Sequence, residues 1–373
     1  MGKKILVLCT TDSMIWNFLV PHINDLETKG YSVECACSET GDFFANLEKI
    51  HNLKMHKIEF ARSPYNIKNY SAYKNLVKLV RKNQYDVIFC HEPVGGLMGR
   101  IVGKKCGCKV LYMAHGFHFF KGAPLVNKLV YYSVEKVLSK LTDVLITINE
   151  EDFEASQKFY AKKKYKINGI GIDTNKFIRI DGCTDLQKEL NLNDDDYLLL
   201  SVGELIERKN HACVIEAIKR LDNPHIRYAI AGDGELYDQL SKMIEENGLT
   251  NQVYLLGYRT DISKLCNCAD VFVMPSLQEG LSVALMEAMA CAKPIIASKI
   301  RGNVDLIDDN LGGILVEAKD VSGYADAILY GYKYKTEFLK FGQYNSEKIK
   351  EFDVETVKKQ LALIYSECLE ETK

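Results

Sequence analysis

The strongest constraint on the fold is a repeated alternation of short apolar runs with longer helical patterns. Runs rich in Val, Ile and Leu recur along the chain, and the stretches between them have amphipathic helical spacing. Nearly continuous apolar strands that alternate with helices are typical of a parallel sheet covered by helices on both faces. We therefore expect strands at residues 3–10, 32–38, 85–92, 108–116, 142–149, 196–204, 226–234, 251–258, 269–276, 293–298 and 312–317.

The alternation falls into two halves. It pauses at "NGIGIDTNKFI", residues 168–178, where glycines interrupt the pattern. The length of 373 residues also favours two domains over one. We predict an α/β domain over residues 1–170, a second over 171–350, and a C-terminal amphipathic helix within 351–373 that packs back towards the first domain.

Charge, hydropathy and cysteine usage exclude several classes of protein. The chain has 48 basic and 50 acidic residues, which argues against a nucleic-acid partner. No run approaches the roughly 20 apolar residues of a spanning helix, and the N-terminal run is too short for a signal peptide. The C-x-C pairs at Cys106 and Cys266 lack zinc-site spacing. We expect a reduced, cytoplasmic protein.

Polar loops follow several strands of the second half, where open α/β sheets bind ligands. These loops begin at "VGELIERKNH" (202–211), "AGDGE" (231–235), "LGYRTDI" (256–262) and "PSLQEGLS" (275–282). Arg208 and Lys209 suit a diphosphate, because Arg forks two oxygens and Lys is a compact charge. Such a pair is by itself more often a solvated surface feature. The two glycines Gly232 and Gly234 let a backbone approach a ligand.

Glu287 is the most informative residue of the second half. It is the one charge between Glu279 and Lys293. If a helix begins after Ser282 as N-cap, every helical neighbour of Glu287 is apolar. A buried carboxylate is costly unless it accepts hydrogen bonds, and paired ribose hydroxyls would supply them. The alternative is a structural glutamate paired with an Arg or Lys elsewhere in the chain.

The two glutamates Glu279 and Glu287, in "PSLQEGLSVALMEAMACAKPIIAS", resemble the signature of retaining glycosyltransferases of family 4, which have the GT-B fold. The resemblance extends over nearly the whole chain. The motifs "HEPVGGLMGRI", "AHGFHFFKGAPL" and "TDVLITINEEDF" are similar to a bacterial branch that assembles capsular and exopolysaccharide repeat units. The resemblance implies two Rossmann-like parallel-sheet domains that face a central cleft.

The resemblance implies a donor site in the second domain, with UDP as the expected nucleotide. Glu287 would hold the ribose, Glu279 the transferred sugar or its phosphate, and Lys209 the diphosphate. The family's arginine position is occupied by Glu204, so Arg208 is expected to supply the missing charge. The remaining donor-binding candidates are Gly203, Gly232, Gly234, Tyr258, Arg259, Gly280, Leu281 and Ser282.

The resemblance also implies roles for the first domain. His115 occupies the position of a family histidine that faces the donor sugar, and with Lys209 and Glu279 it completes the expected catalytic set. His91, Glu92, His118 and Lys121 are candidates to bind the acceptor, a lipid-linked saccharide at the inner membrane face. Segment 115–141 mixes aromatic residues, which look exposed in the sequence, with lysines, as suits an anionic bilayer surface. An ordinary amphipathic helix with core aromatics is an equal alternative.

The implied chemistry is a front-side transfer that retains the anomeric configuration and needs no metal or other cofactor. The Asp-x-Asp pattern at 194–196 occurs in metal-dependent transferases. It precedes a strand, at the wrong end of the sheet, so we interpret it as a turn. Three alternatives remain: a GT-B nucleotide-sugar 2-epimerase, a non-catalytic sugar-nucleotide sensor, and, less favoured, an NAD-dependent enzyme, for which the G-x-G-x-x-G fingerprint is missing.

Overall fold

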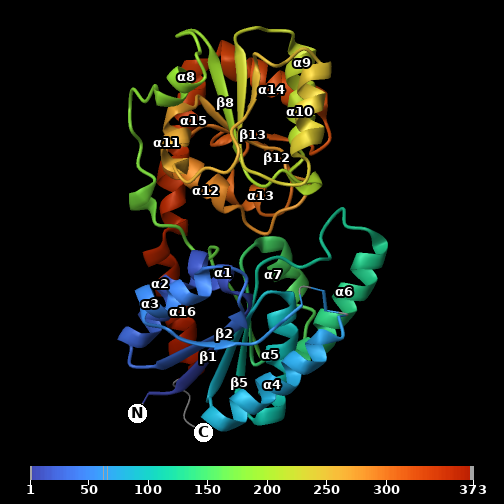
Figure 1. The fold of residues 1–373 in the computed structure, drawn as a ribbon, viewed down its shortest axis with the longest axis vertical. Coiled ribbons are helices and arrows are strands. Elements are labelled where there is room, and N and C mark those ends of the chain that lie inside the picture. The colour runs from blue at the N-terminus through green and yellow to red at the C-terminus, as the bar shows by residue number, and fades with distance from the viewer. Residues whose placement is uncertain (1, 62, 65, 370–373) are drawn as a thin grey trace. The chain divides into compact units, whose positions relative to one another are not determined.

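A computed structural model describes residues 2–61, 63–64 and 66–369 (Figure 1). The chain forms two compact units, the first comprising residues up to Gly171 together with those from Val354 onward, and the second Ile172–Asp353. The boundary at residues 171 and 172 lies in the glycine-containing segment 168–178.

The first unit is built on a seven-stranded sheet in the order β3-β2-β1-β4-β5-β6-β7, with every neighbouring pair parallel. The strands are β1 (Lys4–Thr11), β2 (Ser32–Ser38), β3 (Lys54–Lys57), β4 (Val87–His91), β5 (Lys109–Ala114), β6 (Val144–Thr147) and β7 (Lys163–Lys166). The helices are α1 (Asp12–Met14), η1 (Ile15–Leu19), α2 (Val20–Thr28), α3 (Phe43–His51), α4 (Lys68–Asn83), α5 (Pro93–Cys106), α6 (Leu125–Leu138), η2 (Ser139–Leu141), α7 (Glu150–Ser156) and α16 (Val354–Leu369).

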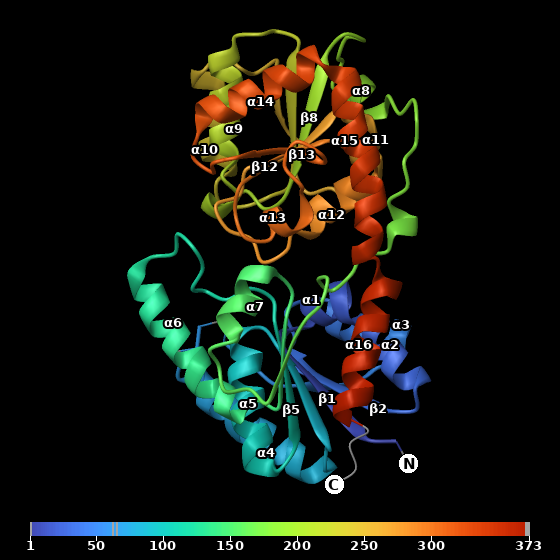
Figure 2. The ribbon, with the colours of Figure 1, turned by 180° about the vertical axis from the view of Figure 1, so that it is seen from behind.

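Helices cover both faces of this sheet. Apolar side chains of α4 and α5 form one core with β1, β4 and β5, whereas α16 packs with α2 (Figure 2). The predicted C-terminal helix thus belongs to the first unit, and its last four predicted residues, 370–373, lie outside the described residues.

The second unit has a six-stranded parallel sheet in the order β10-β9-β8-β11-β12-β13. Its strands are β8 (Tyr197–Val202), β9 (Ile226–Ala231), β10 (Val253–Leu255), β11 (Val271–Met274), β12 (Ile295–Ser298) and β13 (Gly313–Val316). Its helices are η3 (Thr174–Lys176), α8 (Asp185–Glu189), η4 (Glu207–Lys209), α9 (His211–Leu221), α10 (Tyr237–Glu246), α11 (Ile262–Cys268), α12 (Val283–Ala290), α13 (Asn303–Leu306), α14 (Val321–Lys333), α15 (Lys335–Lys348) and η5 (Ile349–Phe352).

Both sheets reverse their strand order once, and this locates the ligand-binding edge of each. The reversal lies between β1 and β4 in the first sheet and between β8 and β11 in the second. Open α/β sheets bind ligands at such switch points, beyond the carboxyl ends of the strands. Of the predicted site residues, Glu92 follows β4, Lys209 follows β8, and Glu279 follows β11.

The expectation that all cysteines are reduced is wrong for one pair, because Cys183 and Cys268 form a disulfide. Within the described part of the chain, none of the helices is both long and apolar enough to cross a bilayer.

Candidate active site

A cluster of charged side chains lies at the switch point of the second sheet. Lys209, in η4 after β8, places its Nζ 2.8 Å from Oε1 of Glu279, in the loop after β11. Arg208 donates from Nη1 to the same oxygen at 3.1 Å and to the backbone carbonyl of Gln278 at 3.0 Å. The backbone N–H of Leu277 donates to the carbonyl of Arg208 at 2.8 Å, so the two loops are joined directly. Both predicted cations thus converge on the predicted glutamate.

Helix α12 begins where the sequence predicts, but Glu287 on it is half-buried and not fully buried. Ser282 is the N-cap, and its Oγ accepts a hydrogen bond from the Leu285 N–H at 3.4 Å. Burial among apolar neighbours raises the pKa of Glu287 from its ordinary value to about 7. Among the described residues, none forms an ion pair with this carboxylate or donates a hydrogen bond to it. The structural alternative of a paired, buried Glu287 therefore finds no support.

Three loops meet beside this cluster through close backbone contacts. A Cβ atom on Gly232 would lie 1.8 Å from the carbonyl oxygen of Gly203, and one on Gly234 would lie 2.6 Å from that of Leu205. The Gly232 N–H donates to the Gly257 carbonyl at 2.8 Å. The glycines at these positions therefore let the loops after β8, β9 and β10 pack together. From the sequence we had assigned Gly232 and Gly234 to the close approach of a ligand.

Tyr258 and Arg259 differ in their surroundings. The Tyr258 side chain is exposed. Arg259 pairs with Glu189 at 2.6 Å and with Asp261 at 2.8 Å, so its guanidinium is engaged with carboxylates of its own unit. The backbone of this segment and the exposed Tyr258 ring therefore remain candidates to meet the base, whereas the Arg259 guanidinium is already paired.

Sequence reasoning missed Arg301, in the loop after β12. Arg301 is buried, and its Nε donates to the backbone carbonyl of Glu279 at 3.1 Å. The adjacent Gly302 has a φ of 82°, and a Cβ there would lie 2.5 Å from the Gly280 carbonyl oxygen. This loop therefore supports the Glu279–Ser282 turn through its backbone. The sequence signal was weak, because Arg301 is the second of two cations within three residues of the end of an apolar strand.

Two histidines from neighbouring strands contact each other in the first unit. His91 ends β4 and is fully buried, and its Nδ1 lies 3.1 Å from Nε2 of His115, which follows β5. Burial lowers the pKa of His115 to about 4 and lowers that of His91 as well, so both are neutral at pH 7. One ring must donate and the other accept, which fixes a tautomer for each. His91 is therefore buried against His115, and an acceptor role for it stays a prediction.

Glu92 adopts a strained backbone between these histidines and α5. Its φ of 60° and ψ of 164° lie in a region that non-glycine residues occupy at a cost of about 1–3 kcal/mol, most often at functional sites. Its Oε2 accepts from the backbone N–H groups of Thr10, at 2.8 Å, and Thr11, at 3.4 Å. The carboxylate therefore lies at the switch point of the first sheet, against the loop that follows β1.

A small cavity of about 120 Å³ opens beside these residues. It brings together the predicted residues Glu92, His115 and His118, and it also involves two residues of α6. Lys121 lies outside it and is exposed, with its backbone N–H donating to Glu151 at 2.5 Å. The lining consists of Glu92, Pro93, Tyr112, His115, Gly116, Phe117, His118, Tyr131 and Glu135.

The loop between His115 and His118 is held by α7, through residues that sequence reasoning did not assign. Asn149 is the N-cap of α7, and its Oδ1 accepts from the Asp152 N–H at 2.9 Å. Asp152 Oδ2 in turn accepts from the Phe117 N–H at 3.1 Å and from Asn149 Nδ2 at 2.8 Å. The order Asn-x-x-Asp at a helix start was a usable signal, since caps commonly have an acid three residues on.

For Phe117 and Phe119 of segment 115–141, the structure favours the alternative of core aromatics over the exposed set. Phe117 and Phe119 are core residues whose rings stack at 4.7 Å. Phe119 and Tyr132 both pack on Phe159, of the segment after α7. Mutual burial of large rings outweighs the polarity of the neighbouring lysines.

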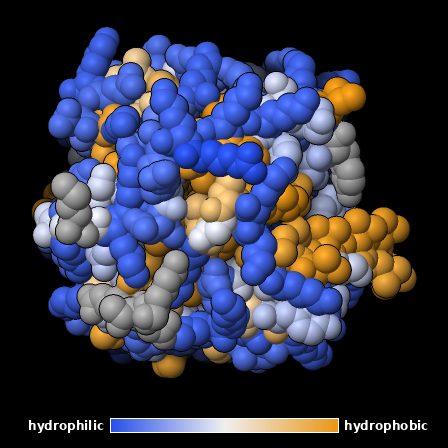
Figure 3. All heavy atoms as spheres, turned by 90° about the horizontal axis from the view of Figure 1, so that it is seen from below, coloured by the Kyte–Doolittle hydropathy of each residue, from blue (hydrophilic) through white to orange (hydrophobic). Residues whose placement is uncertain are grey.

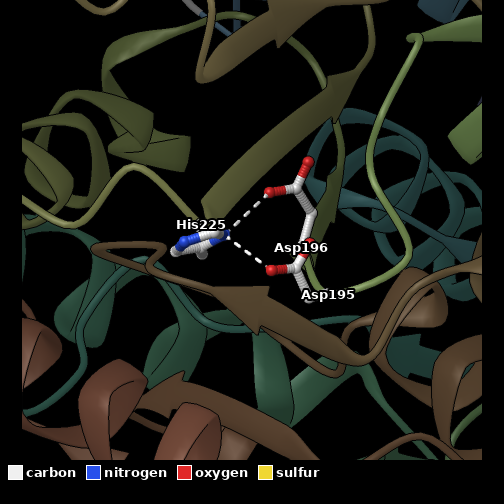
Figure 4. A group of neighbouring side chains, drawn as sticks. All are labelled: Asp195, Asp196 and His225. Atoms are coloured by element: carbon white, nitrogen blue, oxygen red, sulfur yellow. Dashed lines mark ion pairs between the residues drawn. The ribbon is translucent and has the colours of Figure 1, made fainter.

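Asp194–Asp196 form the turn that we predicted. The Asn193 N–H donates to Asp196 Oδ2 at 2.9 Å, and β8 begins at the next residue. Asp195, Asp196 and His225 approach closely enough to hold a cation (Figure 4), but Nε of Arg227 already lies 3.1 Å from Asp196. The cluster lies at the amino ends of β8 and β9, away from Lys209 and Glu279. We interpret it as an ion-pair network that ties this turn to β9.

Comparisons with known proteins show the family of the chain. Residues 4–149 match the family described as "Glycosyl transferase 4-like", and residues 184–347 match "Glycosyl transferases group 1". The chain is 34% identical to the putative glycosyltransferase EpsD of Bacillus subtilis, over 98% of this chain and 97% of that protein. It is also 34% identical, over 70% of each chain, to the UDP-Gal:alpha-D-GlcNAc-diphosphoundecaprenol alpha-1,3-galactosyltransferase of Escherichia coli.

Solved structures share the fold. Anabaena Alr3699/HepE in complex with UDP and glucose superimposes with a TM-score of 0.82 at 20% identity, covering 98% of this chain and 100% of that one. Two parallel-sheet α/β units of this kind make the fold GT-B, which is that of a large class of glycosyltransferases. The chain belongs to the group 1 glycosyltransferases, with a glycosyl transferase 4-like N-terminal domain.

Proposed function

We propose that this glycosyltransferase moves a hexosyl or N-acetylhexosaminyl group from a UDP-sugar to a lipid-linked saccharide, with retention of configuration, in the synthesis of a capsule, exopolysaccharide or related surface glycan. The observation that supports this best is Glu287, a half-buried carboxylate without a partner among the described residues, in the same unit as the Lys209–Glu279–Arg208 cluster. A carboxylate in that state is suited to accept both ribose hydroxyls of a nucleotide.

UDP is the favoured nucleotide because it is associated with similar proteins. The Escherichia coli relative is named for a UDP-galactose donor, and the Anabaena structure contains UDP and glucose. The base would meet the backbone near Tyr258, after β10.

The cations would bind the donor's diphosphate and stabilise it as it leaves. In the absence of donor, Glu279 holds Lys209 and Arg208 in place at 2.8 and 3.1 Å. Glu204 approaches Arg208 as a second carboxylate, at 4.0 Å, so a diphosphate would replace carboxylates as the partner of the two cations. Backbone N–H groups at Leu281 and Ser282, near the start of α12, add further donors. Charge that develops on the leaving diphosphate is thereby stabilised electrostatically, without a metal ion.

The transfer would follow a front-side scheme. The bond from the anomeric carbon to the diphosphate breaks while the acceptor hydroxyl attacks from the same face, and the hydroxyl proton passes to the leaving phosphate oxygen. No carboxylate of the protein acts as nucleophile. His115 would orient the reacting sugar as a neutral imidazole.

The acceptor would bind to the first unit, at the cavity beside Glu92 and His118. The Escherichia coli relative is named for a diphosphoundecaprenol-linked acceptor. Lys121 would contact the acceptor diphosphate, and His91 would act as a positioning residue for His115. An acceptor of this kind is held in a bilayer, so the enzyme would work in the cytoplasm, at the membrane surface.

The first experiment is a thermal-shift and calorimetric panel of UDP-, GDP- and TDP-sugars. We expect a UDP-sugar at 100 times its Kd to stabilise the wild type by about 2.7 kcal/mol. Glu287→Ala should lose this effect, whereas Glu246→Ala, an exposed acid of α10, should retain it. Binding that is equal in the wild type and Glu287→Ala would contradict the ribose assignment. A sugar epimerised without any acceptor would instead favour the 2-epimerase alternative.

A further inference from the structure

Helix α6 leaves one complete face of apolar side chains in solvent. The exposed fractions are 69% for Val126, 71% for Leu129 and 62% for Val137, and Val130 and Val134 lie between them. The spacing of these residues is that of one stripe along a helix. Figure 3 shows a contiguous hydrophobic area at the right edge of the molecule, on the side where α6 lies in Figure 1. Scattered exposed aliphatics are normal, but a contiguous patch marks an interaction surface.

The opposite face of the same helix lines the acceptor cavity. Tyr131 contributes to the lining, with its ring 5.0 Å from that of His118. Glu135 also lines the cavity, and it is anchored by the buried Arg100 through bonds of 2.6 and 3.0 Å. The orientation of α6 is therefore fixed from the inside, so its aliphatic stripe is held outwards by the fold.

The charged residues in the segment around the stripe are mostly positive. Between residues 121 and 140 the chain has four lysines and a single acid, Glu135. Arg100 pairs with Glu135, which leaves the lysine charge uncompensated within the segment. Lys121, Lys128 and Lys140 are exposed. Aliphatic residues flanked by lysines are typical of helices that lie in the interface of an anionic bilayer.

A second copy of the chain fits this face less well. A helix of 14 residues is roughly 21 Å long, and one face of it offers on the order of 250 Å². A standard interface needs about 800 Å² from each partner. Two copies of α6 would also bring lysines against lysines. A bilayer imposes neither a minimum area nor a complementary shape.

We propose that the outer face of α6, formed by Leu125, Val126, Leu129, Val130, Val134 and Val137, docks into the surface of an anionic lipid bilayer. This inference rests on the proposed function, because it explains how the acceptor cavity on the inner side of α6 reaches a saccharide whose lipid stays in the membrane. The docking surface is aliphatic and lysine-flanked, and it does not include the aromatic residues of segment 115–141, whose exposure the sequence had left open.

The test is co-sedimentation of the full-length protein with vesicles of phosphatidylethanolamine and phosphatidylglycerol, or of phosphatidylcholine alone. We expect binding to the anionic vesicles and much weaker binding to the neutral ones. Leu129→Gln should reduce partitioning about tenfold, since burial of one leucine is worth that much. Leu363→Gln is the matched control, because Leu363 is similarly exposed, at 66%, on α16.

Three results would overturn the docking proposal: no vesicle binding, equal binding by Leu129→Gln and the wild type, or a lipid-independent dimer that Leu129→Gln dissociates. Transfer to a water-soluble diphosphate-linked acceptor separates this inference from the proposed function. Leu129→Gln should leave that transfer unchanged. If the wild type binds anionic vesicles through α6 but transfers no sugar to any acceptor, the proposed function fails while the docking surface stands.

Discussion

At the scale of single residues, the two candidate sites contain side chains whose pKa burial shifts, and cations that are paired with a carboxylate. Glu287 is the clearest example, because burial alone favours its neutral form. Lys209 and Arg208 differ from it in that a carboxylate already compensates them. The ionised form of Glu287 is unfavourable in this environment, and a ligand that donates hydrogen bonds to it would stabilise that form.

Replacing Glu287 should change how stability depends on pH. Its pKa is raised to about 7 in the folded protein, so the unfolded chain releases this proton at lower pH. Stability of the wild type should therefore fall as pH rises from about 4.5 to 7, by on the order of 3 kcal/mol. Ligand-free Glu287→Gln should be more stable than the wild type at pH 8, with the difference gone below about pH 4.5. The measurement is chemical denaturation of both proteins across this pH range. A difference in stability between Glu287→Gln and the wild type that does not change with pH would contradict the raised pKa of Glu287.

Replacing His91 should affect turnover more than donor binding. His91→Leu removes the partner of His115, and we expect kcat to fall about tenfold or more with KM for the donor nearly unchanged. His91→Asn retains a hydrogen-bonding group on a short side chain and should recover part of the loss. If both variants lose activity equally and melt early, His91 is structural only.

At the scale of elements, the sites depend on how loops are joined to one another. The loops after β8, β9 and β10 touch through glycine backbones, and the loop after β5 is held by the start of α7. These contacts fix backbone N–H groups and side chains before any ligand arrives, which is preorganisation.

Gly232→Ala tests one such junction. Its Cβ would lie 1.8 Å from the Gly203 carbonyl, so the two loops must separate. We expect a loss of about 1–3 kcal/mol in stability and a clear loss of UDP affinity. Gly41→Ala is the control, because a Cβ at Gly41 meets no atom within 4 Å. Equal behaviour of the two variants in denaturation and UDP titration would contradict this view.

At the scale of the whole molecule, the chain has a separate apolar core in each unit. The core around α4 and α5 belongs to the first unit, and two further cores on either side of the second sheet belong to the other. Each unit therefore has its own source of stability.

Hydrogen exchange with and without UDP should reveal this division. We expect UDP to slow exchange in the loops at 203–209, 232–234 and 279–287, and in the strands of the second sheet. Exchange in β1, β4 and β5 should change little, because these strands belong to the other core. Protection that spreads equally through both sheets would show that the units behave as one cooperative body.

The apolar alternation in the sequence was sufficient to predict every strand of the second sheet. The first sheet was predicted except for its two edges, β3 and β7. Both are short and lysine-rich, "KMHK" and "KKYK", and they pair with a neighbour on one side only. Edge strands do not need continuous apolar runs, so the pattern gives no signal there.

The sequence by itself determined the parallel-sheet architecture, the cap at Ser282 and the apolar surroundings of Glu287, because these follow from residues close together in the chain. Only the tertiary structure decided which face of α6 is exposed, that His91 lies beneath His115, and that Arg301 and Asp152 support the two sites. Those outcomes depend on contacts between residues far apart in sequence. The burial of one ring or one guanidinium group determines which hydrogen bonds its neighbours form.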